Sequence, residues 1–209
     1  MCVGHGPTSA LRLRSDEVST PLRIEVPNGI YHVTARGNNK ETIYHDDAER
    51  QVFLRLLERT ARKHRWIVLA YCLMGNHYHL VLQTPFGVLS RGFDELNGGF
   101  ARIVNLRQER TNHLFGRRFS SELIESDSHM LEAARYVVLN PVRAGLCDRP
   151  EEWPWSSYRA CAGLELGRPF LAVAELLWHF GARPEHARAE YCAFVGEGRG
   201  SVAATVTGV

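Results

Sequence analysis

The sequence predicts an α+β fold: a ferredoxin-like sandwich with an antiparallel sheet and helices packed on it, followed by a C-terminal helical appendage. Three observations support this class. A single strand pattern is followed by an amphipathic helix pattern, two apolar strand patterns then meet at a two-residue loop, and helical patterns occupy most of the remaining chain. This order of elements is typical of antiparallel α+β sandwiches.

Local signals bound the first strand and the first helix. Residues 30–36 (IYHVTAR) read as a strand, which the turn residues 37–39 (GNN) end. Asp46 or Asp47 is suited to cap the next helix, because an aspartate side chain accepts a hydrogen bond from a free backbone N–H of the first turn. That helix is expected to end near His64.

A strand hairpin follows this helix. The apolar segment 66–74 (WIVLAYCLM) is expected to form a buried strand, and 77–83 (HYHLVLQ) its partner. Gly75 and Asn76 lie between them as a two-residue loop of the Gly-X type, which suits a tight turn. A helix is then expected over 88–111, although it contains glycines that lower helix propensity.

The second half of the chain is mostly helical. Residues 119–124 read as an extended segment, and Ser128 is suited to cap a helix over 129–139. Pro141 is expected to end that helix, since the residue before a proline disfavours helical geometry. Residues 153–158 (WPWSSY) form a rigid aromatic turn.

The C-terminal part reads as two amphipathic helices over 169–195, separated near 181–184, and a frayed tail over 196–209. The predicted organisation is an N-terminal arm (1–28), a main α+β domain (29–160) and a C-terminal helical appendage with its tail (161–209).

The composition indicates a globular protein of the reducing cytoplasm. A chain of 209 residues supports one core with a small appendage. No apolar run approaches the roughly 20 residues that span a bilayer, and the N-terminus lacks the apolar core of a secretion signal. The five cysteines include no C-x-x-C pair, and their odd number argues against a disulfide framework.

The basic residues are almost all arginines. Only Lys40 and Lys63 of the 25 basic residues are lysines, and the formal net charge is +2. Arginine grips phosphate at two points, which lysine does not do, but GC-rich coding also exchanges lysine for arginine. Arginines are concentrated at 50–65 and 101–118. Such local basic faces are able to follow a phosphate backbone even in a nearly neutral protein.

The most specific motif is the histidine pair His77 and His79. Residues two apart in a strand project to the same face, so both rings line one side while Tyr78 packs on the other. Two converging imidazoles suit a transition metal such as manganese, and magnesium becomes plausible when phosphate and water complete the shell. An alternative is that both histidines only form hydrogen bonds on a half-buried sheet face.

Tyr136 and Asn140 supply further chemistry. They are four residues apart and therefore lie one turn apart on the same helix face. The amide oxygen of Asn140 is a hard metal ligand, and the phenol of Tyr136 is a potential nucleophile. The alternative for Tyr136 is a core tyrosine that faces the sheet.

With these residues in view, the chain resembles the REP-associated tyrosine transposases, a branch of the single-tyrosine HUH endonucleases close to insertion-sequence transposases. Five blocks carry the resemblance in the order found in that family: YHVTARGNNK (31–40), AYCLMGNHYHLVLQTP (70–85), FGRRFSSELI (115–124), ARYVVLNPVRAGL (134–146) and WPWSSY (153–158). The resemblance covers roughly residues 30–158, so it makes 29–160 the nuclease domain.

The resemblance implies roles for individual residues. His77, His79 and Asn140 match the metal ligands, for Mg²⁺ or Mn²⁺, and Tyr136 matches the nucleophile. The implied enzyme cleaves and rejoins single-stranded DNA next to palindromic hairpins through a 5′-phosphotyrosine, as a nucleoid-associated monomer or homodimer without a membrane partner. The residues expected near the DNA are Arg36, Asn38, Asn39, Arg117, Arg118 and Arg143.

Other assignments stay open at this stage. His32 and Thr34 are candidates for contacts with extruded bases, while His32 also suits a role on the sheet face. Either the metal or an arginine, for instance Arg135 or Arg143, is expected to stabilise the phenolate of the nucleophile, and the sequence does not choose between them. Two departures from the family pattern are Gly75, where proline is usual, and Tyr78, where an aliphatic residue is common.

Two rival functions use the same fold. The first is a non-catalytic protein that binds DNA hairpins as a regulator. The second is a metal-dependent phosphoesterase that does not need Tyr136. A covalent DNA adduct separates the transposase from the first rival, and Tyr136→Phe separates it from the second.

Overall fold

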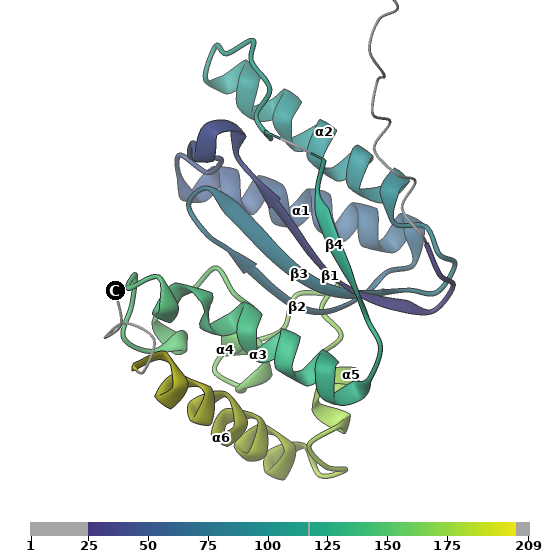
Figure 1. Ribbon diagram of the computed structural model, residues 1–209, viewed down its shortest axis with the longest axis vertical. Helices are drawn as coiled ribbons and strands as arrows, with labels where there is room; N and C mark the ends of the chain where they lie inside the picture. The colour runs from purple at the N-terminus through teal and green to yellow at the C-terminus, as the bar shows by residue number, and fades with distance from the viewer. Residues whose placement is uncertain (1–24, 117, 204–209) are drawn as a thin grey trace, which may run out of the picture.

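The computed structural model describes residues 25–116 and 118–203 and has the predicted α+β architecture (Figure 1). Four strands pair antiparallel in the order β2-β3-β1-β4. The strands are β1 (Gly29–Arg36), β2 (Ile67–Leu73), β3 (His77–Thr84) and β4 (Ser120–Ile124). The helices are α1 (Asp47–His64), α2 (Ser90–Arg107), α3 (Asp127–Arg143), α4 (Tyr158–Cys161), α5 (Val173–Trp178) and α6 (Pro184–Ala203).

Helices cover both faces of the sheet, and neighbouring residues of β3 show which helix covers which face. Tyr78 points toward α1 and α2: its ring lies 4.8 Å from that of Phe53, and its hydroxyl donates to Asn97 at 2.7 Å. His79 points the other way, toward Tyr136 of α3, with ring centroids 5.7 Å apart. The β1-α1-β2-β3-α2-β4 unit therefore has its helices on one face, and α3 covers the other.

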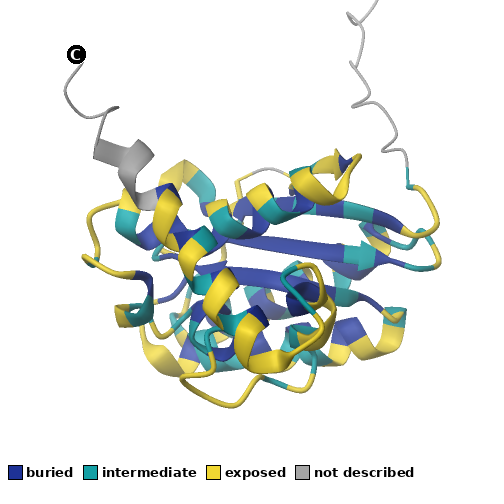
Figure 2. Ribbon diagram, turned by 90° about the horizontal axis from the view of Figure 1, so that it is seen from below, coloured by how far each residue is buried: buried dark blue, intermediate teal, exposed yellow. Residues whose placement is uncertain are grey.

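The core lies between these layers. Tyr78, Phe53 and Phe100 form an aromatic cluster under α1 and α2, with the centroids of the two phenylalanine rings 5.2 Å apart. Figure 2 shows that the strands are largely buried, whereas the outer faces of the helices are exposed. Tyr78 therefore fits between the two histidines of the motif, because the core has room for its ring and Asn97 accepts a hydrogen bond from its hydroxyl.

The predicted helix starts are confirmed at α1 and wrong at α3. Asp46 caps α1, and its carboxylate accepts a hydrogen bond from the backbone N–H of Glu49 at 2.7 Å. Helix α3 starts two residues earlier than expected, because Ser126 accepts from the N–H of His129 at 3.2 Å. Ser128 instead lies in the first turn, with its hydroxyl 3.0 Å from that of Ser126.

The prediction that Pro141 ends this helix is also wrong, since α3 continues to Arg143. Proline lacks the N–H that would bond to the carbonyl of Val137, four residues earlier. The Asn140 side chain compensates: its amide nitrogen donates to the Tyr136 carbonyl at 2.9 Å and lies 3.5 Å from that of Val137. The helix therefore passes through the proline, and Asn140 lies inside it.

The β2–β3 loop covers residues 74–76, one residue more than predicted, and has a different conformation. Gly75 does not adopt a positive φ, so the loop is not the Gly-X turn expected from the sequence. Its carbonyl accepts from the backbone N–H of Ile43 at 3.1 Å, and the Asn76 carbonyl accepts from that of Gly37 at 2.8 Å. The neighbouring segment therefore sets the shape of the loop.

The free edge of β2 is covered by the C-terminal half of the chain. Within the predicted aromatic turn, Trp153 donates from its indole N–H to the Leu73 carbonyl at 3.0 Å, and the N–H of Ser157 donates to Tyr71. Further along β2, the N–H of Ala172 donates to the Val68 carbonyl. Covering an edge strand in this way blocks edge-to-edge association.

Helix α6 packs against α3, and α5 packs against α6 and β2. Helix α6 continues to Ala203 rather than giving way to a tail at residue 196. Most of the predicted N-terminal arm (1–24) and the end of the tail (204–209) lie outside the described residues. No helix in the described ranges has both the length and the apolar character needed to cross a membrane.

Two glycines of α2 provide a test of this packing. A Cβ on Gly92 would lie 2.1 Å from the Trp66 indole, whereas one on Gly98 would meet nothing within 4 Å. We expect Gly92→Ala to lower the free energy of unfolding by about 1–3 kcal/mol through overpacking. Gly98→Ala should raise it by about 0.5–1 kcal/mol, because alanine is the better helix former. Urea unfolding of both variants checks this, and changes of the same sign would contradict the packing of α2 against Trp66.

Candidate active site

The β1–β3 register brings polar residues of two strands to the face covered by α3. Thr34 pairs directly with His79, and Arg36 pairs with His77. Directly paired residues project to the same face of the sheet. His32, two residues before Thr34, therefore lies diagonally next to His79.

His79 is held by both neighbours on β1. Its Nδ1 lies 3.0 Å from Nε2 of His32 and 3.1 Å from Oγ1 of Thr34. The two imidazole rings stack with centroids 5.2 Å apart and an interplanar angle of 19°. With Nδ1 engaged and the residue only 6 % exposed, Nε2 is the atom of His79 left for another partner.

His77 has an unambiguous proton position. Its Nδ1 lies 2.6 Å from the side-chain oxygen of Asn76. An amide oxygen only accepts, so Nδ1 carries the proton and Nε2 of a neutral ring keeps its lone pair. The rings of His77 and His79 lie 5.0 Å apart, nearly perpendicular. The motif thus offers two imidazole nitrogens on one face.

Burial keeps these rings neutral. Desolvation lowers the pKa of His77 to about 4, and the Arg36 guanidinium contributes to that lowering. Desolvation, with smaller effects of His77, His32 and Arg36, lowers the pKa of His79 to about 3. Burial also lowers the pKa of His32, against the opposing charge of Glu122. Near pH 7 both motif histidines therefore have a free nitrogen lone pair.

Tyr136 of α3 projects toward the same cluster. Its ring stands edge-on to the rings of His32 and His79, at 5.8 and 5.7 Å between centroids. It remains 40 % exposed, so it is not the core tyrosine of the alternative interpretation. The Arg143 guanidinium carbon lies 4.8 Å from the centre of the Tyr136 ring. Arg135 instead pairs with Glu132 on α3 and lies over a ring of α6.

Asn140 lies one turn beyond Tyr136 and is 9 % exposed. Its amide nitrogen donates within α3, so its carbonyl oxygen is the atom that remains for a cation. Within the described ranges, no three His, Cys, Asp or Glu side chains are placed to hold a metal ion. A cation at the histidine pair would thus need amide, phosphate or water oxygens to complete its coordination.

Two open cavities border the cluster. The first, which we call the tyrosine groove, has a volume of about 460 Å³. It is lined by His32, Glu122, His129, Glu132, Ala133, Tyr136 and Arg143. The second, the turn groove, has a volume of about 600 Å³. It is lined by Thr34, Ala35, Arg36, Gly37, Asn38, Asn39, Lys40, Gly116, Arg118 and Ser120.

The grooves account for most of the residues that the resemblance places near DNA. Arg36, Asn38, Asn39 and Arg118 line the turn groove, which joins the two sequence blocks 31–40 and 115–124. Arg143 lines the tyrosine groove. Arg117 lies outside the described residues.

The contacts of His32 were not predicted. The sequence left it as a candidate for base contact or a sheet-face residue, whereas the structure places it against His79 and Tyr136. The one signal in the sequence was the alternation His32, Thr34 and Arg36 on β1, which matches that of the histidine motif. The contact of His32 with His79 depends on the register between β1 and β3, which the sequence alternation does not specify.

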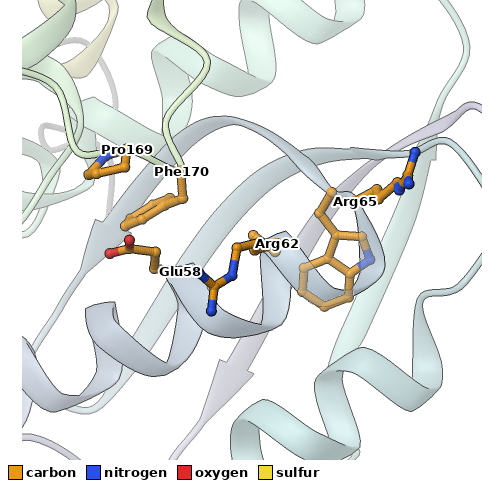
Figure 3. Close-up of a pocket in the computed structure, with 7 residues that line it drawn as sticks. Glu58, Arg62, Arg65, Pro169 and Phe170 are labelled. Atoms are coloured by element: carbon orange, nitrogen blue, oxygen red, sulfur yellow. The ribbon is translucent and has the colours of Figure 1, made fainter.

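A third cavity, of about 290 Å³, shares no residue with the two grooves (Figure 3). Glu58, Arg62 and Arg65 of the α1 region line it together with Pro169 and Phe170. In Figure 3 the Arg62 side chain lies between Glu58 and Arg65. The cavity provides a basic position remote from the histidine cluster.

Comparison with known proteins identifies counterparts of this fold. The sequence profile of the family “Transposase IS200 like” matches residues 25–139, more than half of the chain. A Haemophilus influenzae protein assigned as a REP-associated tyrosine transposase is 24 % identical over an alignment of 141 residues, which covers 62 % of this chain and 80 % of that protein.

A solved structure of a REP-associated tyrosine transposase bound to a REP hairpin shares the fold. It superposes with a TM-score of 0.61 at 18 % sequence identity, over 74 % of this chain and 92 % of that one. The four-stranded sheet and its helices therefore form the fold of that transposase, which confirms the predicted fold class.

The buried neutral histidines predict a pH dependence of stability. Their pKa is about 6.5 in an unfolded chain and lower in the folded one. The unfolded state therefore binds more protons, and the stability present above pH 6.5 declines as the pH falls toward 4. We expect His79→Gln to reduce the change in unfolding free energy between pH 7 and pH 5. Urea unfolding at both pH values measures it. His186→Gln, at a histidine of α6, is the control; an equal effect of both substitutions would refute the assignment.

Proposed function

The chain belongs to the IS200-like transposase family and is therefore an enzyme that acts on DNA; we propose that it cleaves and rejoins single-stranded DNA beside palindromic hairpins through a phosphotyrosine at Tyr136. One observation carries this proposal. An exposed tyrosine stands edge-on to His79, the buried and neutral member of the histidine pair, and lines a groove that also holds an arginine.

Tyr136 supplies the nucleophile. Its phenol loses a proton and its oxygen forms a bond to phosphorus, while the bond from phosphorus to the 3′ oxygen breaks and that oxygen takes up a proton. The DNA is then joined to the protein through its 5′ phosphate, and a free 3′ hydroxyl remains. The covalent bond conserves energy, so a new 3′ end is able to displace Tyr136 without ATP.

Arg143 is the arginine that lies over the ring of this tyrosine. A phenol with a pKa near ~10 is a weak nucleophile at neutral pH. The guanidinium above the ring is a permanent positive charge, at 4.8 Å from the ring centre. It lies where it would attract the DNA phosphate that Tyr136 attacks. Arg135 is directed to α6 and does not compete for this role.

The donor atoms present fit a divalent cation. Nε2 of His77 and of His79 are the free nitrogens of neutral rings, and the amide oxygen of Asn140 is a hard ligand on the facing helix. When bound there, Mg²⁺ or Mn²⁺ would act as a Lewis acid on the scissile phosphate and orient it. The protein's own contribution is to keep the two rings neutral and fixed on one strand.

The turn groove suits the path of the DNA strand. It adjoins the histidines through the pairing of Arg36 with His77. It combines the cationic Arg36, Lys40 and Arg118 with the amides of Asn38 and Asn39. Arginines neutralise phosphates, and amides form hydrogen bonds with exposed base edges. Because the structural relative is bound to a REP hairpin, we propose a hairpin with a single-stranded flank as the partner.

The central experiment uses a labelled single-stranded oligonucleotide that contains a hairpin from beside the gene, with Mn²⁺ or Mg²⁺. A denaturing gel should show a covalent protein–DNA band that EDTA removes. Tyr136→Phe should abolish the band, at least ~1,000-fold below wild type on the scale of lost nucleophilic catalysis. It should bind the hairpin on a native gel within about twofold, because binding does not need the hydroxyl.

Other outcomes identify the rivals. Cleavage that persists in Tyr136→Phe would indicate a phosphoesterase that uses water. Hairpin binding without a covalent band, whichever metal is supplied, would indicate a binding protein.

Substitution in the turn groove tests the DNA path. Arg36→Ala and Arg118→Ala should each weaken hairpin binding and lower the slope of log affinity against log salt by about 0.7 per lost single-strand phosphate contact. Arg62→Ala, in the remote cavity of Figure 3, removes an arginine of equal charge and is the matched control. Fluorescence anisotropy across a salt series measures both quantities. Equal losses in all three variants would show general charge attraction, not a path through the turn groove.

A further inference from the structure

His32 contacts both the metal-ligand candidate His79 and the nucleophile candidate Tyr136. We propose that His32 is a positioning residue: it keeps the proton of His79 on Nδ1 and so leaves Nε2 of His79 free to bind a cation. This inference rests on the proposed function only where it assigns metal binding to Nε2 of His79. The proton position itself is a property of the protein alone.

The distance between the two rings makes their proton positions dependent on each other. At 3.0 Å, one of the two nitrogens carries the shared hydrogen and the other accepts it. When Nδ1 of His79 carries it, Nε2 of His79 has a lone pair. When Nε2 of His32 carries it, neutral His79 holds its proton on Nε2 and cannot bind a metal there. The choice between the two states therefore rests with His32.

Thr34 does not make this choice. Its hydroxyl, 3.1 Å from Nδ1 of His79, is able either to donate or to accept. It therefore satisfies both proton arrangements equally well. An imidazole with a fixed proton is different, because its second nitrogen must accept when its first one donates.

The surroundings of His32 favour the arrangement that leaves His79 free. Glu122 pairs with His32 across β1 and β4, and both residues line the tyrosine groove. A carboxylate on this side favours a proton on the groove edge of His32, away from His79. Nε2 of His32 then accepts from His79. A partner that holds the other ring nitrogen is the usual way in which a protein fixes the tautomer of a metal-binding histidine.

His32 also connects this proton position to the nucleophile. Its ring stands edge-on to that of Tyr136, at 71° and 5.8 Å between centroids, while it stacks on His79. The His32 imidazole thus contacts both rings and fixes the orientation of the Tyr136 phenol relative to His79. A hydrocarbon of similar size would fill the space but would not accept the hydrogen bond.

The test compares three variants of the full chain. His32→Gln is able to present an oxygen acceptor near the position of Nε2, whereas His32→Leu fills the space without an acceptor. Thr34→Val removes the hydroxyl that is compatible with both proton positions of His79. Two quantities are measured: the tautomer of His79 from long-range ¹H–¹⁵N spectra without metal, and the Mn²⁺ affinity from calorimetry without DNA.

We expect the proton of His79 on Nδ1 in the wild type. His32→Leu should shift it partly to Nε2 and weaken Mn²⁺ binding by about 10- to 100-fold, the range for a lost partner of a metal-binding histidine. His32→Gln should restore the wild-type tautomer and bind Mn²⁺ within about threefold of wild type, and so should Thr34→Val. Rescue by glutamine separates a hydrogen-bonding role from packing, which leucine would satisfy at least as well.

Three results would overturn the proposal: a wild-type His79 with its proton on Nε2, an unchanged tautomer in His32→Leu, or equal effects of leucine and glutamine. The covalent-adduct assay separates this failure from that of the proposed function. An adduct together with a proton on Nε2 refutes the positioning role alone. The expected tautomer shifts without any adduct would keep His32 as the residue that sets the proton of His79 and would refute the transposase chemistry.

Discussion

The antiparallel register between β1 and β3 is the constraint on which the site depends. It pairs Thr34 with His79 and Arg36 with His77, and thereby brings His32 within 3.0 Å of His79. Side chains alternate along a strand, so a slip of one residue would turn the histidines into the aromatic core and Tyr78 out of it. Burial of Tyr78 against α1 and α2 therefore fixes the orientation of β3, which keeps His77 and His79 on the opposite face. The same packing thus stabilises the core and sets the geometry of the site.

Helix α3 turns this polar face into a site. A sandwich with only α1 and α2 would leave the histidines on an open sheet, where solvation would raise their pKa toward the ordinary value. Covering that face buries His79, keeps it neutral and brings Tyr136 to it. The Asn140 amide also supports the helix across Pro141. One side chain thus has a structural contact through nitrogen and, in the proposed function, a ligand role through oxygen.

Sequence reasoning predicted the features that local rules decide. Alternation placed His79 on the face opposite to Tyr78, and Asp46 was one of the two candidate caps, because both inferences follow from neighbouring residues. It failed where distant groups decide. Pro141 was expected to end α3, and Gly75 was assigned a turn that the segment 37–44 overrides. The choice between Arg135 and Arg143 likewise depended on α6, whose position no local pattern in the sequence specifies.

The charges around the site explain why few protein ligands suffice for the proposed chemistry. The candidate ligands His77, His79 and Asn140 carry no negative charge, so they would not balance a divalent cation by themselves. A DNA phosphate would supply the missing negative charge and further oxygen ligands. Cation and DNA would then each strengthen the binding of the other, by the same factor as linkage requires. Such coupling would assemble the complete catalytic set only when the strand is in place.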